Sequence, residues 1–126
     1  LLDRYSLAAT EFIVGKAREF ARQNRKKLLI VLFDPSRAMN EMRQSGTRYD
    51  QPVVDYLRRE SFDYFDMNEV QLRDFARYSI PFKEYMKLYF IGHYNPRGNH
   101  FFAYSIKDRI VSWLEPKPVP YQRGVE

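Results

Sequence analysis

The first hydrophobic pattern of the chain has the period of a helix. Between Ala8 and Asn24, apolar side chains recur every three or four residues, and charged side chains lie between them. The apolar positions are Ala9, Phe12, Ile13, Ala17, Phe20 and Ala21. We therefore predict an amphipathic helix from Ala8 to Asn24 with this stripe as its apolar face.

Two later segments lack a helical period and are predicted strands. Lys27 to Phe33 is apolar at almost every position, which is typical of a strand buried on both faces in a parallel sheet. Asp34 and Ser36 follow it, where they either face a ligand crevice or cap the turn, and a turn cap is the favoured role. Phe62 to Met67 is the second predicted strand, and it ends near Asp66.

The other segments are predicted from turn and cap signals. Arg37 to Asp50 is polar and contains a glycine, which indicates a connection, and a helix from Gln51 to Arg59 follows, capped by Asp50. Asn68 is placed to cap a short helix from Glu69 to Tyr78. Pro81 breaks any helix, so we predict an extended segment or lid-like loop from Tyr85 to Ile91.

The final predicted helix begins after Asn95, with Pro96 in its first turn, and carries an apolar stripe up to Leu114. The whole order alternates helices with strands, which favours an α/β layer structure with parallel strands. Two parallel strands cannot complete a sheet alone, so we expect further strands from elsewhere. The exposed sheet edge is then expected to promote self-association.

Composition narrows the class of protein. The 126 residues are 44% hydrophobic and 17% aromatic, as in a folded domain with one core. No cysteine is present, which excludes disulfides, thiol nucleophiles and cysteine-ligated metals. No apolar run reaches the ~20 residues of a membrane span. The net charge of +5 is spread among interspersed acids and bases, which does not favour nucleic acid as a partner.

Both histidines lie in or just after the polar turn that leads into the final helix. A neutral imidazole presented by a loop in front of a helix is a common general base, and His93 has that position. His100 falls in the first turns of the helix, away from the apolar stripe, as expected for a solvated side chain. Carboxylates at metal-ligand spacing are missing, so we predict no metal site.

Gly-His-Tyr-Asn-Pro-Arg-Gly-Asn-His-Phe-Phe-Ala, residues 92–103, resembles the last conserved block of SGNH (GDSL-type) hydrolases. The order of elements from Ala8 to Leu114 is also similar to the second half of that family's domain. The resemblance implies that residues 1–115 form the C-terminal part of a flavodoxin-like, three-layer α/β/α sandwich whose N-terminal half is missing. Residues 116–126 are then a proline-rich extended tail.

The same resemblance implies a serine ester hydrolase or acyltransferase acting on esters or O-acylated carbohydrates, without a cofactor. His93 aligns with the family's general base, Asn95 with the asparagine two places after it, and Gly98 with the glycine at the helix entry. Members of the family are often exported or associated with the cell envelope. Nothing in the residues of this chain indicates its compartment.

This chain departs from the family in its acid, in its nucleophile block, and in the oxyanion-hole glycine and Gly-x-Asn-Asp blocks, which are absent. Ile91 and Phe90 occupy the positions of the acid that orients the histidine, so Asp66 is the predicted substitute acid, with Asp34 as another candidate. The Gly-Asp-Ser nucleophile block is absent, so the serine is expected to come from the N-terminal half, and this chain alone is expected to be inactive. A non-catalytic interaction module and a weak nucleic-acid or anion binder stay open as alternatives.

Overall fold

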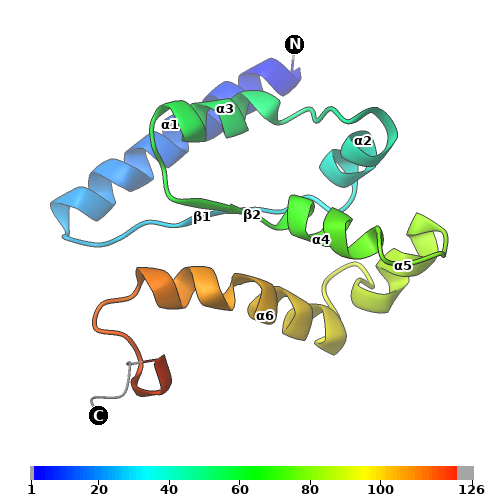
Figure 1. The fold of residues 1–126 in the computed structure, drawn as a ribbon. Coiled ribbons are helices and arrows are strands. Elements are labelled where there is room, and N and C mark those ends of the chain that lie inside the picture. The colour runs from blue at the N-terminus through cyan, green and yellow to red at the C-terminus, as the bar shows by residue number, and fades with distance from the viewer. Residues whose placement is uncertain (1, 122–126) are drawn as a thin grey trace. The chain divides into compact units, whose positions relative to one another are not determined.

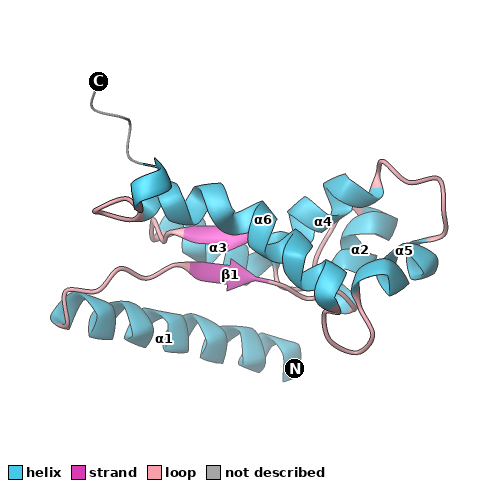
Figure 2. Ribbon diagram, turned by 90° about the horizontal axis from the view of Figure 1, so that it is seen from below, coloured by secondary structure: helices cyan, strands magenta, loops and turns pink. Residues whose placement is uncertain are grey.

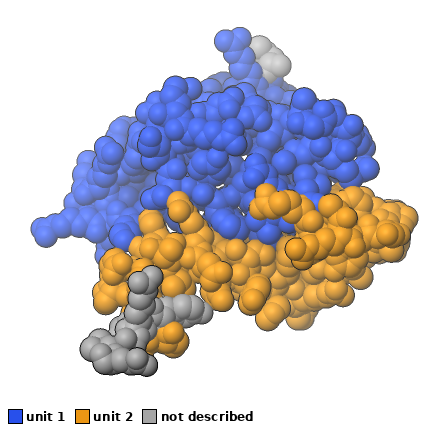
Figure 3. Space-filling model, viewed as in Figure 1, with its two compact units in different colours: residues 1–72 blue, residues 73–126 orange. Residues whose placement is uncertain are grey.

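The computed structural model describes residues 2–121, and the chain forms two compact units (Figure 3). Unit 1 comprises Leu1–Leu72 and unit 2 comprises Arg73–Glu126. The elements of unit 1 are α1 (Leu2–Gln23), β1 (Ile30–Leu32), α2 (Arg37–Ser45), α3 (Gln51–Arg59), β2 (Tyr64–Asp66) and most of α4 (Met67–Phe75). Those of unit 2 are the end of α4, then α5 (Phe82–Tyr89), α6 (Pro96–Trp113) and a 3₁₀ turn (Val119–Tyr121).

Unit 1 is built around two short parallel strands. β1 and β2 pair in one register, with Ile30 opposite Tyr64 and Leu32 opposite Asp66. Helices α1 and α3 lie on the same side of this sheet (Figure 1). The core between them is centred on Val53, Leu57 and Phe62 and is joined by side chains from α1, the strands and their flanks, namely Leu7, Val14, Leu28, Ile30, Leu32, Tyr56 and Tyr64.

The large side chains of the predicted apolar stripe do not face the core, and Ala21 is the one member of the stripe that is buried. Leu7, Val14 and Ala21 form the inner face, since the first two join the core cluster and Ala21 is buried. Phe12, Ile13 and Phe20 of the stripe are instead 64–66% exposed. An amphipathic helix normally turns its wider apolar face inward. Here α3 and the strands contact the narrower face, and the wider one is left to solvent.

Unit 2 has an aromatic core. Tyr85 and Tyr89 of α5 are buried, and their rings lie 5.2 Å apart, centroid to centroid. Both hydroxyl groups donate hydrogen bonds to the Asp74 carboxylate, at 3.0 and 3.1 Å. The Phe101 ring of α6 lies 5.0 Å from that of Tyr89. The phenol pairs with Asp74 therefore satisfy the polar ends of the two buried rings.

The predicted three-layer α/β/α sandwich is wrong. The described part of the chain is mainly helical, with six α-helices and one sheet of two strands. The predicted seven-residue strand from Lys27 to Phe33 pairs only at Ile30–Leu32, because β2 offers just three partner residues. Outside that stretch, Leu28 contacts the core from an extended segment without ladder hydrogen bonds.

Two predicted connections are also helices. The supposed polar connection contains α2, which buries Ala38 and Met39 and ends at Gly46, a left-handed residue with φ of 70°. Pro81 does not exclude a helix after it. It is the N-cap of α5, where the missing N–H costs no hydrogen bond. In the predicted tail, Val119–Tyr121 forms a 3₁₀ turn, and residues 122–126 lie outside the described residues.

Candidate general-base turn

A tight reverse turn between α5 and α6 presents His93. Phe90 and Tyr94 form an antiparallel bridge, and the Ile91 amide donates to the His93 carbonyl at 2.8 Å. Gly92 adopts a φ of 92°, a backbone conformation that other residues rarely reach without strain. The backbone of the turn is therefore fixed on both sides of His93, whose own side chain is exposed.

The imidazole of His93 is oriented by the backbone. Its Nδ1 lies 2.9 Å from the carbonyl oxygen of Tyr94. A carbonyl oxygen can only accept, so Nδ1 carries the hydrogen in this contact. In the neutral ring the lone pair is then on Nε2, which is the nitrogen that a general base uses. The Tyr94 carbonyl therefore orients the ring of His93.

Asn95 connects the turn to α6. Its Oδ1 accepts a hydrogen bond from the Gly98 amide at 2.9 Å, so it caps the helix as its sequence position indicates. Its Nδ2 donates to the Leu88 carbonyl at the end of α5, at 3.1 Å. One side chain therefore holds the end of α5 and the start of α6 together, with the His93 turn between them.

Gly98 lies so close to Tyr89 and Tyr94 that its position leaves no room for a side chain. A Cβ built on it would lie well inside van der Waals contact with the Tyr89 carbonyl oxygen and with the ring of Tyr94. The backbone oxygen cannot move without disturbing the last turn of α5. Only a residue without a side chain fits here, which explains the helix-entry glycine that the sequence pattern singled out.

Replacing Gly98 by alanine is expected to lower the free energy of unfolding of unit 2 by about 2–3 kcal/mol, through overpacking of a filled site. The measurement is urea unfolding followed by the fluorescence of Trp113, the only tryptophan of the chain, which lies in α6. Asn99→Ala, at the next and exposed position, is the control and should change stability by less than about 0.5 kcal/mol. Equal urea midpoints for the two variants would mean that position 98 has room for a side chain.

A shallow groove lies on α6 one turn beyond the cap. It has a volume of about 240 Å³ and is lined by Tyr89, Arg97, His100, Phe101 and Tyr104. The Arg97 guanidinium lies 5.1 Å from the Tyr89 ring centroid, and the His100 ring stacks on that of Tyr104. His100 is exposed, as predicted, and its neighbour is an aromatic ring.

Asp66, the predicted substitute acid, has a structural role in unit 1. Its Oδ1 accepts from the amides of Asn68 and Glu69, at 3.0 and 3.4 Å, at the start of α4. Its Oδ2 pairs with Arg48, and both side chains are about 95% buried. Asp66 therefore caps α4, in place of the predicted Asn68 cap, and balances a buried cation.

Arg48 was not singled out by the sequence, although it is the centre of this cluster. Its guanidinium also binds Asp50 in a bidentate pair, at 2.6 and 2.8 Å. These hydrogen bonds, first that of Asp50 and then that of Asp66, raise the pKa of Arg48 despite its burial. Asp50 is the N-cap residue of α3, as predicted, but its side chain makes no hydrogen bond to the start of the helix.

Asp34 behaves as the predicted turn cap. Its Oδ1 accepts from the amides of Ser36 and Arg37, at 3.0 and 2.9 Å. Burial opposes ionisation, but these contacts and the Tyr49 hydroxyl still lower the pKa of Asp34. The Asp34 amide in turn donates to Oδ1 of Asn68 at 2.7 Å, which ties the segment after β1 to the segment after β2.

Comparison of the chain with protein-family models, curated proteins and solved structures found no match. Among the described helices, none combines the length and the apolar character that a membrane crossing requires.

Proposed function

We propose that this chain carries the general-base part of a serine ester hydrolase, with His93 as the base. The observation that carries the proposal is the 2.9 Å contact between His93 Nδ1 and the Tyr94 carbonyl. Whenever the ring is neutral, this contact places its lone pair on Nε2, on an exposed side chain of a rigid turn. Ile91 and Phe90 occupy the family's acid positions, but a general base at His93 does not need that acid, because a backbone oxygen orients the ring instead.

In the proposed reaction, Nε2 of His93 takes the proton of a serine hydroxyl while the serine oxygen attacks the ester carbonyl carbon. The same nitrogen then donates that proton to the departing alkoxide. The serine would be supplied by another segment or chain, since no serine here has the Gly-Asp-Ser context. The Tyr94 carbonyl would stabilise the imidazolium by accepting a hydrogen bond from its Nδ1–H, although without the full charge of a carboxylate.

The substrate class follows from the resemblance: small esters or O-acylated carbohydrates. The groove on α6 supports this choice, because ring faces and a guanidinium are the groups that stack on sugars and bind their oxygens.

The protein that contains this chain is expected to hydrolyse p-nitrophenyl acetate faster than buffer does. If the folded protein hydrolyses the ester no faster than buffer does, the proposed hydrolase function is wrong.

The orientation of His93 can be tested on this chain alone. In ¹⁵N-detected NMR of the neutral rings, His93 is expected to carry its hydrogen on Nδ1, against the usual preference for Nε2. His100, whose ring stacks on Tyr104, is the internal reference in the same sample. A hydrogen on Nε2 of His93 would contradict the proposed base, because that nitrogen would then have no lone pair to offer.

A further inference from the structure

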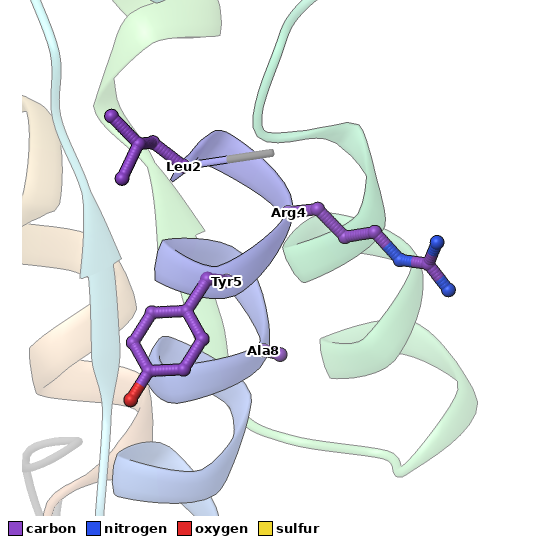
Figure 4. Close-up of a pocket in the computed structure, with 4 residues that line it drawn as sticks. All are labelled: Leu2, Arg4, Tyr5 and Ala8. Atoms are coloured by element: carbon purple, nitrogen blue, oxygen red, sulfur yellow. The ribbon is translucent and has the colours of Figure 1, made fainter.

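Helix α1 has a second apolar face with no partner in unit 1. We call the five large side chains Leu2, Tyr5, Phe12, Ile13 and Phe20 the α1 outer face, and they are between 64% and 83% exposed. At roughly 100° per residue they fall within one stripe of the helix, nearly opposite the inner face. Figure 4 shows Leu2 and Tyr5 projecting to one side of the helix and Arg4 to the other.

The neighbouring strand is also incomplete. β1 pairs with β2 along one edge and has no strand on its other edge in the described part of the chain. In Figure 2, α1 lies on the β1 side of the sheet. Val31, at the centre of β1, is 39% exposed. A free strand edge next to an apolar helix face marks one continuous side of unit 1 as an interaction surface.

The size of this surface suits a dimer. Five large side chains at these exposures offer on the order of 600 Å² per copy. Two copies would bury roughly 1,200 Å², the lower bound of specific protein interfaces, before any contribution from β1. We propose that the α1 outer face binds the same face of a second copy of this chain, in an antiparallel pair around a twofold axis.

The apolar stripe is compatible with this occupant. An antiparallel register sets Tyr5 opposite Phe20 and Phe12 opposite Ile13 of the second copy, so that large apolar side chains meet along the pair. Lys16, the one charged residue within the stripe, already has Glu19 as a partner at 2.7 Å. Because Glu19 compensates Lys16, the stripe can meet its copy without an unpaired charge in the interface.

The absence of cysteine allows a direct test. Ile13→Cys in the chain is expected to give a covalent dimer with a short bismaleimide, because position 13 lies beside the twofold axis. Tyr104→Cys, at a 67% exposed position in unit 2, should stay monomeric under the same conditions. Equal cross-linking of both variants would indicate random collision and overturn the proposal.

Sedimentation velocity supplies the second measurement. Between about 1 and 100 µM, wild-type chain is expected to shift from monomer to dimer, and Phe12→Glu to raise the dissociation constant at least ~100-fold. Arg4→Glu, on the opposite side of the helix, is the matched control and should leave the dissociation constant within about threefold. A monomer throughout this range, or an equal loss of affinity in both variants, overturns the proposal. So does a monomer that binds vesicles of anionic lipid through Phe12.

Discussion

His93→Ala is expected to lower kcat/KM for p-nitrophenyl acetate by about 10²–10⁴-fold, the usual contribution of a positioned general base. The measurement requires the chain together with the serine-bearing segment that the proposed function calls for. The effect should fall on kcat, because Nε2 of His93 accepts the proton in the transition state and does not bind the ester in the ground state. A backbone carbonyl stabilises the imidazolium less than a carboxylate does, so the lower half of this range is expected.

The matched control is Asn99→Ala, at an exposed position of α6 that does not line the groove, which should change kcat/KM by less than about threefold. His93→Gln separates chemistry from shape, since its amide keeps polar bulk in the turn without a basic nitrogen, and should be as slow as alanine. Trp113 fluorescence and circular dichroism should be unchanged in all three variants. Equal rates for wild type and His93→Ala would remove His93 from the mechanism.

Helix limits and caps that depend on neighbouring residues could be predicted from the sequence. The limits of α3, Gln51–Arg59, were predicted correctly, and α6 begins after Asn95 as the Asn-Pro step indicates. Asn95 acts through groups three residues away, so its role could be read from the order of residues alone. The same holds for Asp34, whose partners are the next turn's amides.

Features that depend on distant residues could not be predicted in this way. The cap of α4 was assigned to Asn68, but Asp66 performs it while also binding Arg48, which is 18 positions earlier. The wider stripe of α1 was expected to be its buried side, yet only contact with α3 and the strands decides which side is buried. The orienting acceptor of His93 is a backbone oxygen, and a backbone group leaves no signature in the sequence.

Arg48→Met is expected to lower the free energy of unfolding of unit 1 by about 3–5 kcal/mol, because it leaves the Asp66 carboxylate buried without a cation. The Arg48 and Asp66 side chains are only 5% and 4% exposed, so water cannot replace the lost partner. Asp50 loses its bidentate contact as well, and with it the fixed path from α2 into α3. The measurement is urea unfolding followed by far-ultraviolet circular dichroism.

Arg59→Met is the matched control, since Arg59 is 64% exposed and pairs with Glu60 at the surface, where such a pair contributes about 0–1 kcal/mol. Adding Asp66→Asn to Arg48→Met should recover part of the loss. The neutral amide removes the uncompensated charge, and its oxygen can still cap α4. A double variant as unstable as Arg48→Met would mean that the arginine acts by filling space. A loss no larger than that of Arg59→Met would mean that the buried pair does not hold unit 1 together.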